Sequence, residues 1–155
     1  MIEQVVEAWR TNQRINAYLI EGISDEGLLC TLSTRGGRNV VRQFCHVHNV
    51  RIYQLERRAR HLSKGAVKFE TKQEPDREAL LRALEDTGER VEQWLRLAAE
   101  GDERVKTMRG GVIASLGYLI SHEGHHRGSI MLTLKQCGHP VAKDQRFGIW
   151  DWDRR

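Results

Sequence analysis

The sequence contains little proline, little cysteine and no long apolar run. Its 155 residues include only two prolines, which suits long uninterrupted helices better than a turn-rich β-sandwich. The three cysteines are an odd number without a CxxC pair, which argues against a disulfide scaffold and favours a reducing compartment. No apolar run approaches the roughly 20 residues that span a bilayer, so we expect no membrane partner.

Targeting signals and nucleic-acid motifs are also missing. The N-terminal residues MIEQVVEAWR contain two acids and lack the apolar segment of a signal peptide, so we expect a cytoplasmic protein. The net charge of +4 is mildly basic. The arginines at 57–60 and 154–155 have no interleaved aromatic residues, so a nucleic acid is not an expected partner. With 39% hydrophobic and 30% charged residues, the chain is typical of one globular domain.

Four long segments have the apolar periodicity of a helix, and no segment alternates as a strand does. We expect these helices over Ile2–Gly22, Asn39–Ser63, Pro75–Glu100 and Gly111–Cys137. Ser24 and Asn39 are favourable N-caps, and Gly138 followed by Pro140 is a typical helix stop. The sequence therefore predicts an all-α four-helix bundle, followed by a short ordered C-terminal tail over Val141–Arg155.

Histidine is the residue type present in excess. Five of the seven histidines form two clusters, His46 with His48, and His122 with His125 and His126. On the fourth helix, His122 and His126 are four residues apart on one flank of the apolar face, so they can share one metal ion. His125 points to nearly the opposite side, so we expect it at the surface, at an interface or beside a ligand.

Glu123, which directly follows His122, allows two interpretations. His122–His126 matches the HExxH string of zinc proteases, but no glutamate follows Glu123, and Ser129 and Leu132 stand where the extended motif has Gly and His. A zinc protease is therefore not expected. We interpret Glu123 as a residue that orients a ligand histidine, and a general base is the alternative.

The second helix carries two histidines, and either of them could be the metal ligand. Periodicity places His48 near the middle of the apolar stripe and His46 on the far side. This favours His48 as the inward residue, either as a metal ligand or as a buried side chain hydrogen-bonded to a neighbour. Cys45 lies on the stripe and is expected to be a small buried residue.

Two segments resemble the DinB/YfiT superfamily of metal-binding four-helix bundles. Residues His122–Gly128 (HEGHHRG) are similar to its HExHHRG segment, and Val41–His46 (VRQFCH) is similar to its apolar run ending in histidine. The resemblance covers essentially the whole chain and implies one DinB-like helical-bundle domain over residues 1–155. It also implies a metal site made of His46, His122 and His126. We choose His46 because a cleft suits a ligand on the flank of the stripe, and His48 stays as the alternative.

The resemblance also implies a chemistry. Three imidazoles leave open positions on an ion, and zinc or nickel suits such ligands. Members of the superfamily are similar to thiol-dependent S-transferases, so we expect a metal-dependent enzyme that activates a low-molecular-weight thiol for transfer to a small molecule. A metal-dependent hydrolase and a non-catalytic stress-related protein with a structural metal are the alternatives.

Three further expectations concern contacts around this site. Arg127 is either a surface or ion-pair residue or holds an anionic group of the substrate or cofactor. Gly117, Gly124 and Gly128 form a line on the fourth helix, which suggests the close approach of another helix or a ligand. Trp150 and Trp152 in the tail either close over the cleft or pack in a homodimer.

Overall fold

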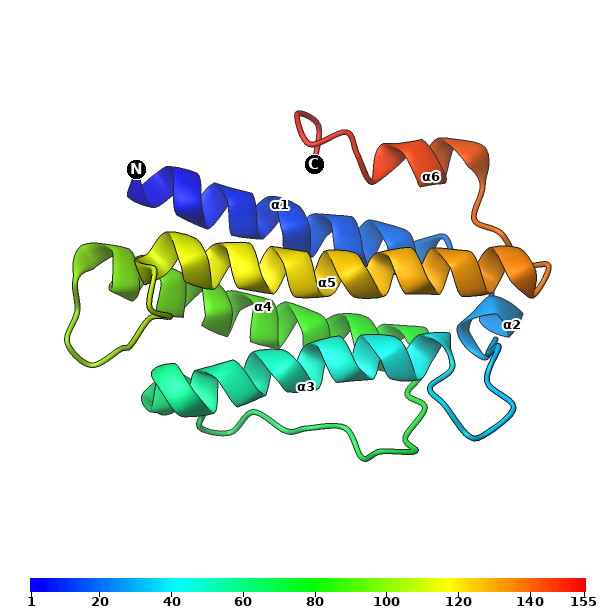
Figure 1. The fold of residues 1–155 in the computed structure, drawn as a ribbon, viewed down its shortest axis with the longest axis horizontal. Coiled ribbons are helices and arrows are strands. Elements are labelled where there is room, and N and C mark those ends of the chain that lie inside the picture. The colour runs from blue at the N-terminus through cyan, green and yellow to red at the C-terminus, as the bar shows by residue number, and fades with distance from the viewer.

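Helices make up most of the chain in the computed structural model, which describes residues 1–155 (Figure 1). The four long helices are α1 (Ile2–Glu21), α3 (Val40–Arg58), α4 (Arg77–Glu100) and α5 (Gly111–Gln136). Three shorter helical segments are α2 (Asp25–Leu28), the 3-10 helix η1 (Arg60–Ser63) and α6 (Lys143–Gly148). The structure contains no β-strand, which confirms the all-helical prediction.

The four long helices lie side by side (Figure 1). Both α1 and α3 pack against α4 and α5. As a result α3 and α5, which carry the two histidine clusters, are direct neighbours and run in opposite directions. None of these helices combines the length and the apolarity needed to cross a membrane.

Side-chain caps fix the beginnings of three helices. Ser24 accepts a hydrogen bond from the backbone N–H of Gly27 at the start of α2, and Asn39 accepts one from Arg42 at the start of α3. Both caps were predicted. Asp76 caps α4, so this helix begins two residues after Pro75. Each such cap contributes about 1 kcal/mol of stability.

The second predicted helix ends earlier than expected. Helix α3 stops at Arg58, and Ala59 leaves the helical conformation before η1 begins. The segment before α5 explains this end, because the Arg58 carbonyl accepts a hydrogen bond of 2.7 Å from the N–H of Lys106. The Arg58 guanidinium in turn donates to the carbonyl of Thr107. A tertiary contact therefore ends a helix that local periodicity would extend.

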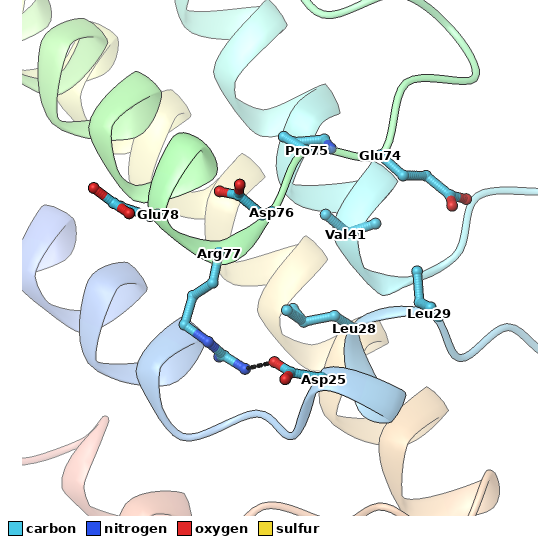
Figure 2. A pocket seen from close by; sticks show the side chains of 9 residues that line it. All are labelled: Asp25, Leu28, Leu29, Val41, Glu74, Pro75, Asp76, Arg77 and Glu78. Carbon is cyan, nitrogen blue, oxygen red and sulfur yellow. Dashed lines mark hydrogen bonds and ion pairs between the residues drawn. The ribbon is translucent and has the colours of Figure 1, made fainter.

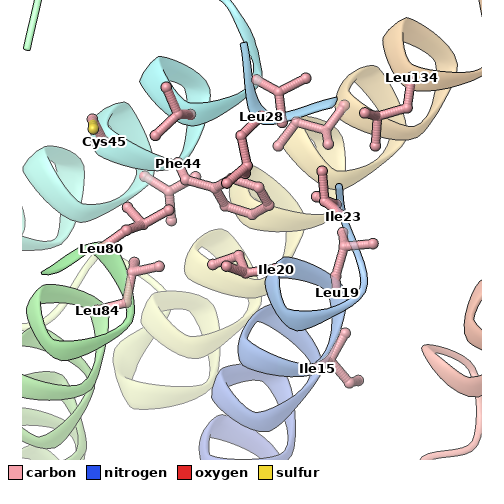
Figure 3. Packing of buried hydrophobic residues seen from close by; sticks show 14 of the residues in the cluster. Ile15, Leu19, Ile20, Ile23, Leu28, Phe44, Cys45, Leu80, Leu84 and Leu134 are labelled. Atoms are coloured by element: carbon pink, nitrogen blue, oxygen red, sulfur yellow. The ribbon is translucent and has the colours of Figure 1, made fainter. Parts of the chain in front are cut away.

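Two apolar clusters fill the interior. One gathers around Phe44 and Ile20 (Figure 3), and the other around Trp9 and Trp94. Burial of each such side chain contributes roughly 1.5–3 kcal/mol. Helical periodicity places Ile113 on the apolar face of α5, but its side chain, near the start of the helix, is 58% exposed. The interior is thus divided into two parts along the long helices.

The C-terminal tail is ordered and lies on α1. Gln145 donates to the carbonyl of Tyr18, the Arg155 guanidinium lies 3.6 Å from the centroid of the Tyr18 ring, and Arg14 donates to the Arg155 carbonyl. Figure 1 shows α6 on the side of α1 away from α3. The tail therefore packs on α1, and the Trp150 side chain is 75% exposed.

Candidate metal centre

Three histidines from two helices converge on one point. His46 comes from α3, while His122 and His126 lie one turn apart on α5. One ring nitrogen of each lies within 4.8 Å of those of the other two. The ring centroids are 5.4 Å apart for His46 and His122, 4.8 Å for His46 and His126, and 4.7 Å for His122 and His126. The neighbouring placement of α3 and α5 produces this group.

The donor set fits a metal ion. Nδ1 of His126 is the one buried side-chain nitrogen or oxygen atom without a hydrogen-bond partner. Such an orphaned group costs about 1–3 kcal/mol, and coordination would remove that cost. Nitrogen ligands of a tetrahedral zinc ion, at about 2.0–2.1 Å from the metal, lie roughly 3.4 Å from one another. Small rotations of the three rings would close the remaining gap.

The three rings are in the form that binds metals. Burial lowers the pKa of His46 to about 4, and the positive charges of Arg38 and His122 act in the same direction. Burial also lowers the pKa of His126 to about 4, with His122 and His46 contributing. The pKa of His122 is lowered by burial, although Glu123 opposes the shift. Neutral imidazoles therefore present free lone pairs near pH 7.

His48, the alternative ligand on α3, has different surroundings from His46. The His48 side chain is only 2% exposed. Its Nδ1 lies 3.0 Å from the carbonyl oxygen of Ala83, and its Nε2 lies 2.9 Å from that of Val67. His48 is thus the buried, hydrogen-bonded residue that periodicity allowed, and it does not reach the histidines of α5. His125 is exposed, with its ring centroid 5.1 Å from that of His126.

Glu123 lies in a buried ion pair beside the ligand histidines. Its side chain is 1% exposed and makes a salt bridge to Arg51, with Nε 2.7 Å from Oε1. Asn12 and Asn16 of α1 also donate to Oε2, at 2.7 and 2.6 Å. Burial alone would raise the pKa of Glu123, but Arg51 and these donors lower it. The carboxylate neither bonds to a ligand histidine nor faces the solvent as a general base would.

Arg127 completes this buried network. Its Nη1 donates to the side-chain oxygens of Asn12 and Asn16, at 2.8 Å each. The network joins α1, α3 and α5 in a polar layer between the two apolar clusters. Asn12, Asn16 and Arg51 were not predicted from the sequence. Their polar side chains at core positions of α1 and α3 could have pointed to this network. Asn12 and Asn16 lie one turn apart on α1.

The surroundings of the three histidines offer both aromatic and cationic groups. Tyr118 stacks on His122, with ring centroids 6.1 Å apart and planes inclined by 13°. Arg38, Arg42 and Glu70 are among the residues that line a cavity of about 90 Å³ beside His46. The histidine group therefore has an aromatic ring beside His122 and a charged cavity beside His46.

A larger cavity lies away from the three histidines, and the polar groups in its wall already have partners. Its volume is about 500 Å³, and it lies where α2, α3 and the start of α4 meet (Figure 2). Asp25 in its wall is paired with Arg77, Asp76 caps α4, and Glu74 accepts from Asn39. No histidine lines this cavity. Its carboxylates already have partners, so it is a poor candidate for the reactive site.

The glycine line on α5 has no partner within the chain. A side-chain methyl group built on Gly117 or Gly128 would meet nothing within 4 Å. Gly124 would meet only the end of the Arg127 side chain, at 3.7 Å. No other helix of this chain therefore approaches these glycines closely, in contrast to the packing that we predicted.

Comparison with known proteins gives one clear result. The family model of the DinB family matches residues 1–152 of the 155-residue chain. This match confirms the family resemblance predicted from the motifs at His122–Gly128 and Val41–His46. A search among curated proteins finds no match.

Proposed function

We propose that this chain, which belongs to the DinB family, binds a divalent metal ion with His46, His122 and His126. The observation that carries the proposal is the approach of three ring nitrogens from two helices to within 4.8 Å of one another. The orphaned Nδ1 of His126 adds support, because it is a buried lone pair without a donor. The lowered pKa values of these histidines keep protons from competing for the site.

The histidines and the residues behind them have different tasks in this proposal. The three imidazoles hold the ion, and zinc or nickel suits an all-nitrogen set. Glu123 and Arg51 act as positioning residues, because their salt bridge joins the two helices that carry the ligands. When bound, the ion lowers the pKa of a thiol or a water molecule that shares the site.

The reaction that we favour is metal-dependent transfer of a low-molecular-weight thiol to a small electrophile. Three protein ligands leave room for a thiol, as catalytic sites do. Tyr118 provides a ring face beside His122, and Arg38 and Arg42 provide positive charge near His46. Nη1 of Arg127 already donates to the two asparagines of α1. We therefore assign Arg127 to the buried network and do not assign it to a substrate anion.

Metal analysis of untagged protein tests the binding step. We expect about one zinc or nickel ion per chain, and a strong loss of metal in His46→Ala, His122→Ala and His126→Ala. His125→Ala is the matched control, since this exposed residue lies beside His126 and outside the proposed ligand set. Equal metal content in wild type and the three ligand variants would refute the site.

A second experiment separates the possible reactions. Cobalt-loaded protein is titrated with low-molecular-weight thiols, and the appearance of a sulfur-to-metal absorption band reports thiol binding. Small electrophiles are then screened with and without the thiol. Thiol-dependent product formation supports transfer, whereas activity without a thiol supports the hydrolase. Loss of the fold on chelation, without any activity, supports a structural metal.

The partners in this proposal are a small-molecule substrate and a second copy of the chain. The homodimer is supported by exposed apolar side chains in the tail, where Trp150 is 75% exposed. Light scattering after size-exclusion chromatography tests it, because a dimer has twice the 17.9 kDa of one chain.

A further inference from the structure

Two cysteines that are distant in the sequence lie side by side, outside the histidine group. Cys30 follows α2, and Cys137 caps the end of α5. Sγ of Cys137 lies 3.8 Å from the carbonyl oxygen of Thr31, the residue directly after Cys30. Burial raises the pKa of the Cys30 thiol, and the neighbouring Cys137 thiol adds to this shift. Both side chains are half-buried, so small solutes can reach this pair.

The backbone on both sides of this pair is well held. The N–H of Cys30 donates to Gly27, and its carbonyl accepts from Val40, the first residue of α3. On the other side, the N–H of Cys137 donates to Thr133, and Gly138 follows with a positive φ of 81°. The backbone hydrogen bonds therefore hold both cysteines in place, and rotation of the side chains can change the separation of the two sulfurs.

We propose that Cys30 and Cys137 form a reversible intramolecular disulfide by exchange with a low-molecular-weight disulfide. The thiolate of one cysteine attacks the small disulfide, which forms a mixed disulfide and releases one small thiol. The second cysteine then attacks the protein sulfur of the mixed disulfide and releases the second small thiol. Two protein thiols are oxidised, one small disulfide is reduced to two thiols, and the two protons pass to solvent or to the released thiolates.

The third cysteine has no part in this exchange. Cys45 is only 4% exposed and belongs to the apolar cluster around Phe44. No other cysteine remains in the chain to pair with it. Cys45 therefore provides an internal reference that stays reduced while Cys30 and Cys137 react.

The disulfide would join the end of α5 to the segment that is hydrogen-bonded to the start of α3. Cys137 ends α5, and the carbonyl of Cys30 is bonded to the first residue of α3. A link between them closes a long loop in the unfolded chain, which stabilises the folded state. This inference does not depend on the proposed function, because it requires neither a metal nor a substrate.

Thiol counting and mass spectrometry on the full chain test the proposal. Reduced protein is equilibrated with glutathione buffers of increasing oxidised fraction, quenched with acid and alkylated. We expect the thiols that can be alkylated after unfolding to fall from three to one per chain, and the mass before alkylation to fall by about 2 Da. Trypsin should yield a linked pair of peptides, residues 15–35 and 136–143. The melting temperature should rise by about 5–10 °C on oxidation.

Three variants separate this pair from general thiol oxidation. Cys45→Ala should form the same linked peptides as wild type. Cys30→Ser and Cys137→Ser should give only a glutathione adduct, with no rise in melting temperature. If wild type instead yields glutathione adducts, intermolecular links or a disulfide that includes Cys45, the proposal is wrong. Because the linked peptides are mapped in wild type, poor folding of a variant does not decide the result.

Discussion

Arg51 and Glu123 form a salt bridge that is closed to solvent, with Nε 2.7 Å from Oε1 and Nη2 2.9 Å from Oε2. The bridge joins the middle of α3 to the middle of α5. Glu123 is next to His122, and Arg51 lies five residues after His46. The pair therefore sets the relative position of the two helices on which the proposed metal ligands stand.

Removal of one partner of this bridge should destabilise the protein strongly. We expect Arg51→Met to lower the free energy of unfolding by about 3–5 kcal/mol, because a buried carboxylate then lacks its counter-charge. Urea denaturation followed by circular dichroism measures this change. Glu78→Gln is the control, since Glu78 pairs with Arg82 on the exposed surface of α4, where such a pair contributes about 0.5 kcal/mol or less. Similar small losses in both variants would show that the bridge contributes little.

His46 and His48 should respond to substitution in opposite ways. His48→Ala removes a buried ring and its hydrogen bond to the carbonyl oxygen of Val67, so we expect a loss of about 2–4 kcal/mol in stability. Its metal affinity should stay within about twofold of wild type, because the ligand set is intact. His46→Ala should keep the metal-free stability within about 1 kcal/mol and lose at least about tenfold in metal affinity. Cobalt titration and urea denaturation of both variants check this, and metal loss in His48→Ala would contradict it.

Much of the fold followed from local patterns. The caps Ser24 and Asn39 and the start of α5 at Gly111 were predictable, because a helix end depends on the few residues around it. The end of α3 was not predictable, since it depends on a hydrogen bond between Arg58 and Lys106, 48 residues away. The exposure of Ile113 depends on which helix lies opposite, and periodicity carries no such information.

The candidate site was predictable only in part. The spacing of His122 and His126 places both on one flank of a helix, and this local property holds in the structure. The choice between His46 and His48 depends on the side from which α5 packs on α3, so helical periodicity alone favoured His48. The role of Glu123 depends on Arg51 and Asn12, which come from two other helices and share no local motif with it.

The stability of the metal-free protein should fall as the pH falls below 6.5. The folded-state pKa values of His46 and His126 are about 4, whereas an unfolded histidine has a pKa near 6.5. Between these values the unfolded chain binds more protons than the folded chain, so acid favours unfolding. The contribution of these two histidines is fully present above about pH 6.5 and is lost as the pH falls to about 4.

Urea midpoints in the presence of a chelator, at pH 7.5, 6.5, 5.5 and 4.5, measure this dependence. His126→Gln removes one of the histidines with a lowered pKa, so its midpoint should fall less steeply than that of wild type. His125→Gln is the matched control and should follow the wild-type curve, because His125 is exposed. A wild-type midpoint that stays constant from pH 6.5 to 4.5 would contradict the prediction.

A bound metal ion should stabilise the folded chain through the three histidines. An ion at a free concentration of 100 times its Kd adds about 2.7 kcal/mol to the free energy of unfolding. For a chain of this size, the melting temperature should therefore rise by about 5–10 °C. Differential scanning fluorimetry with zinc or nickel measures the rise, and a chelator should reverse it. The rise should persist in His125→Ala and disappear in His126→Ala. An equal rise in both variants would mean that the ion acts elsewhere on the protein, because only His126 belongs to the converging group.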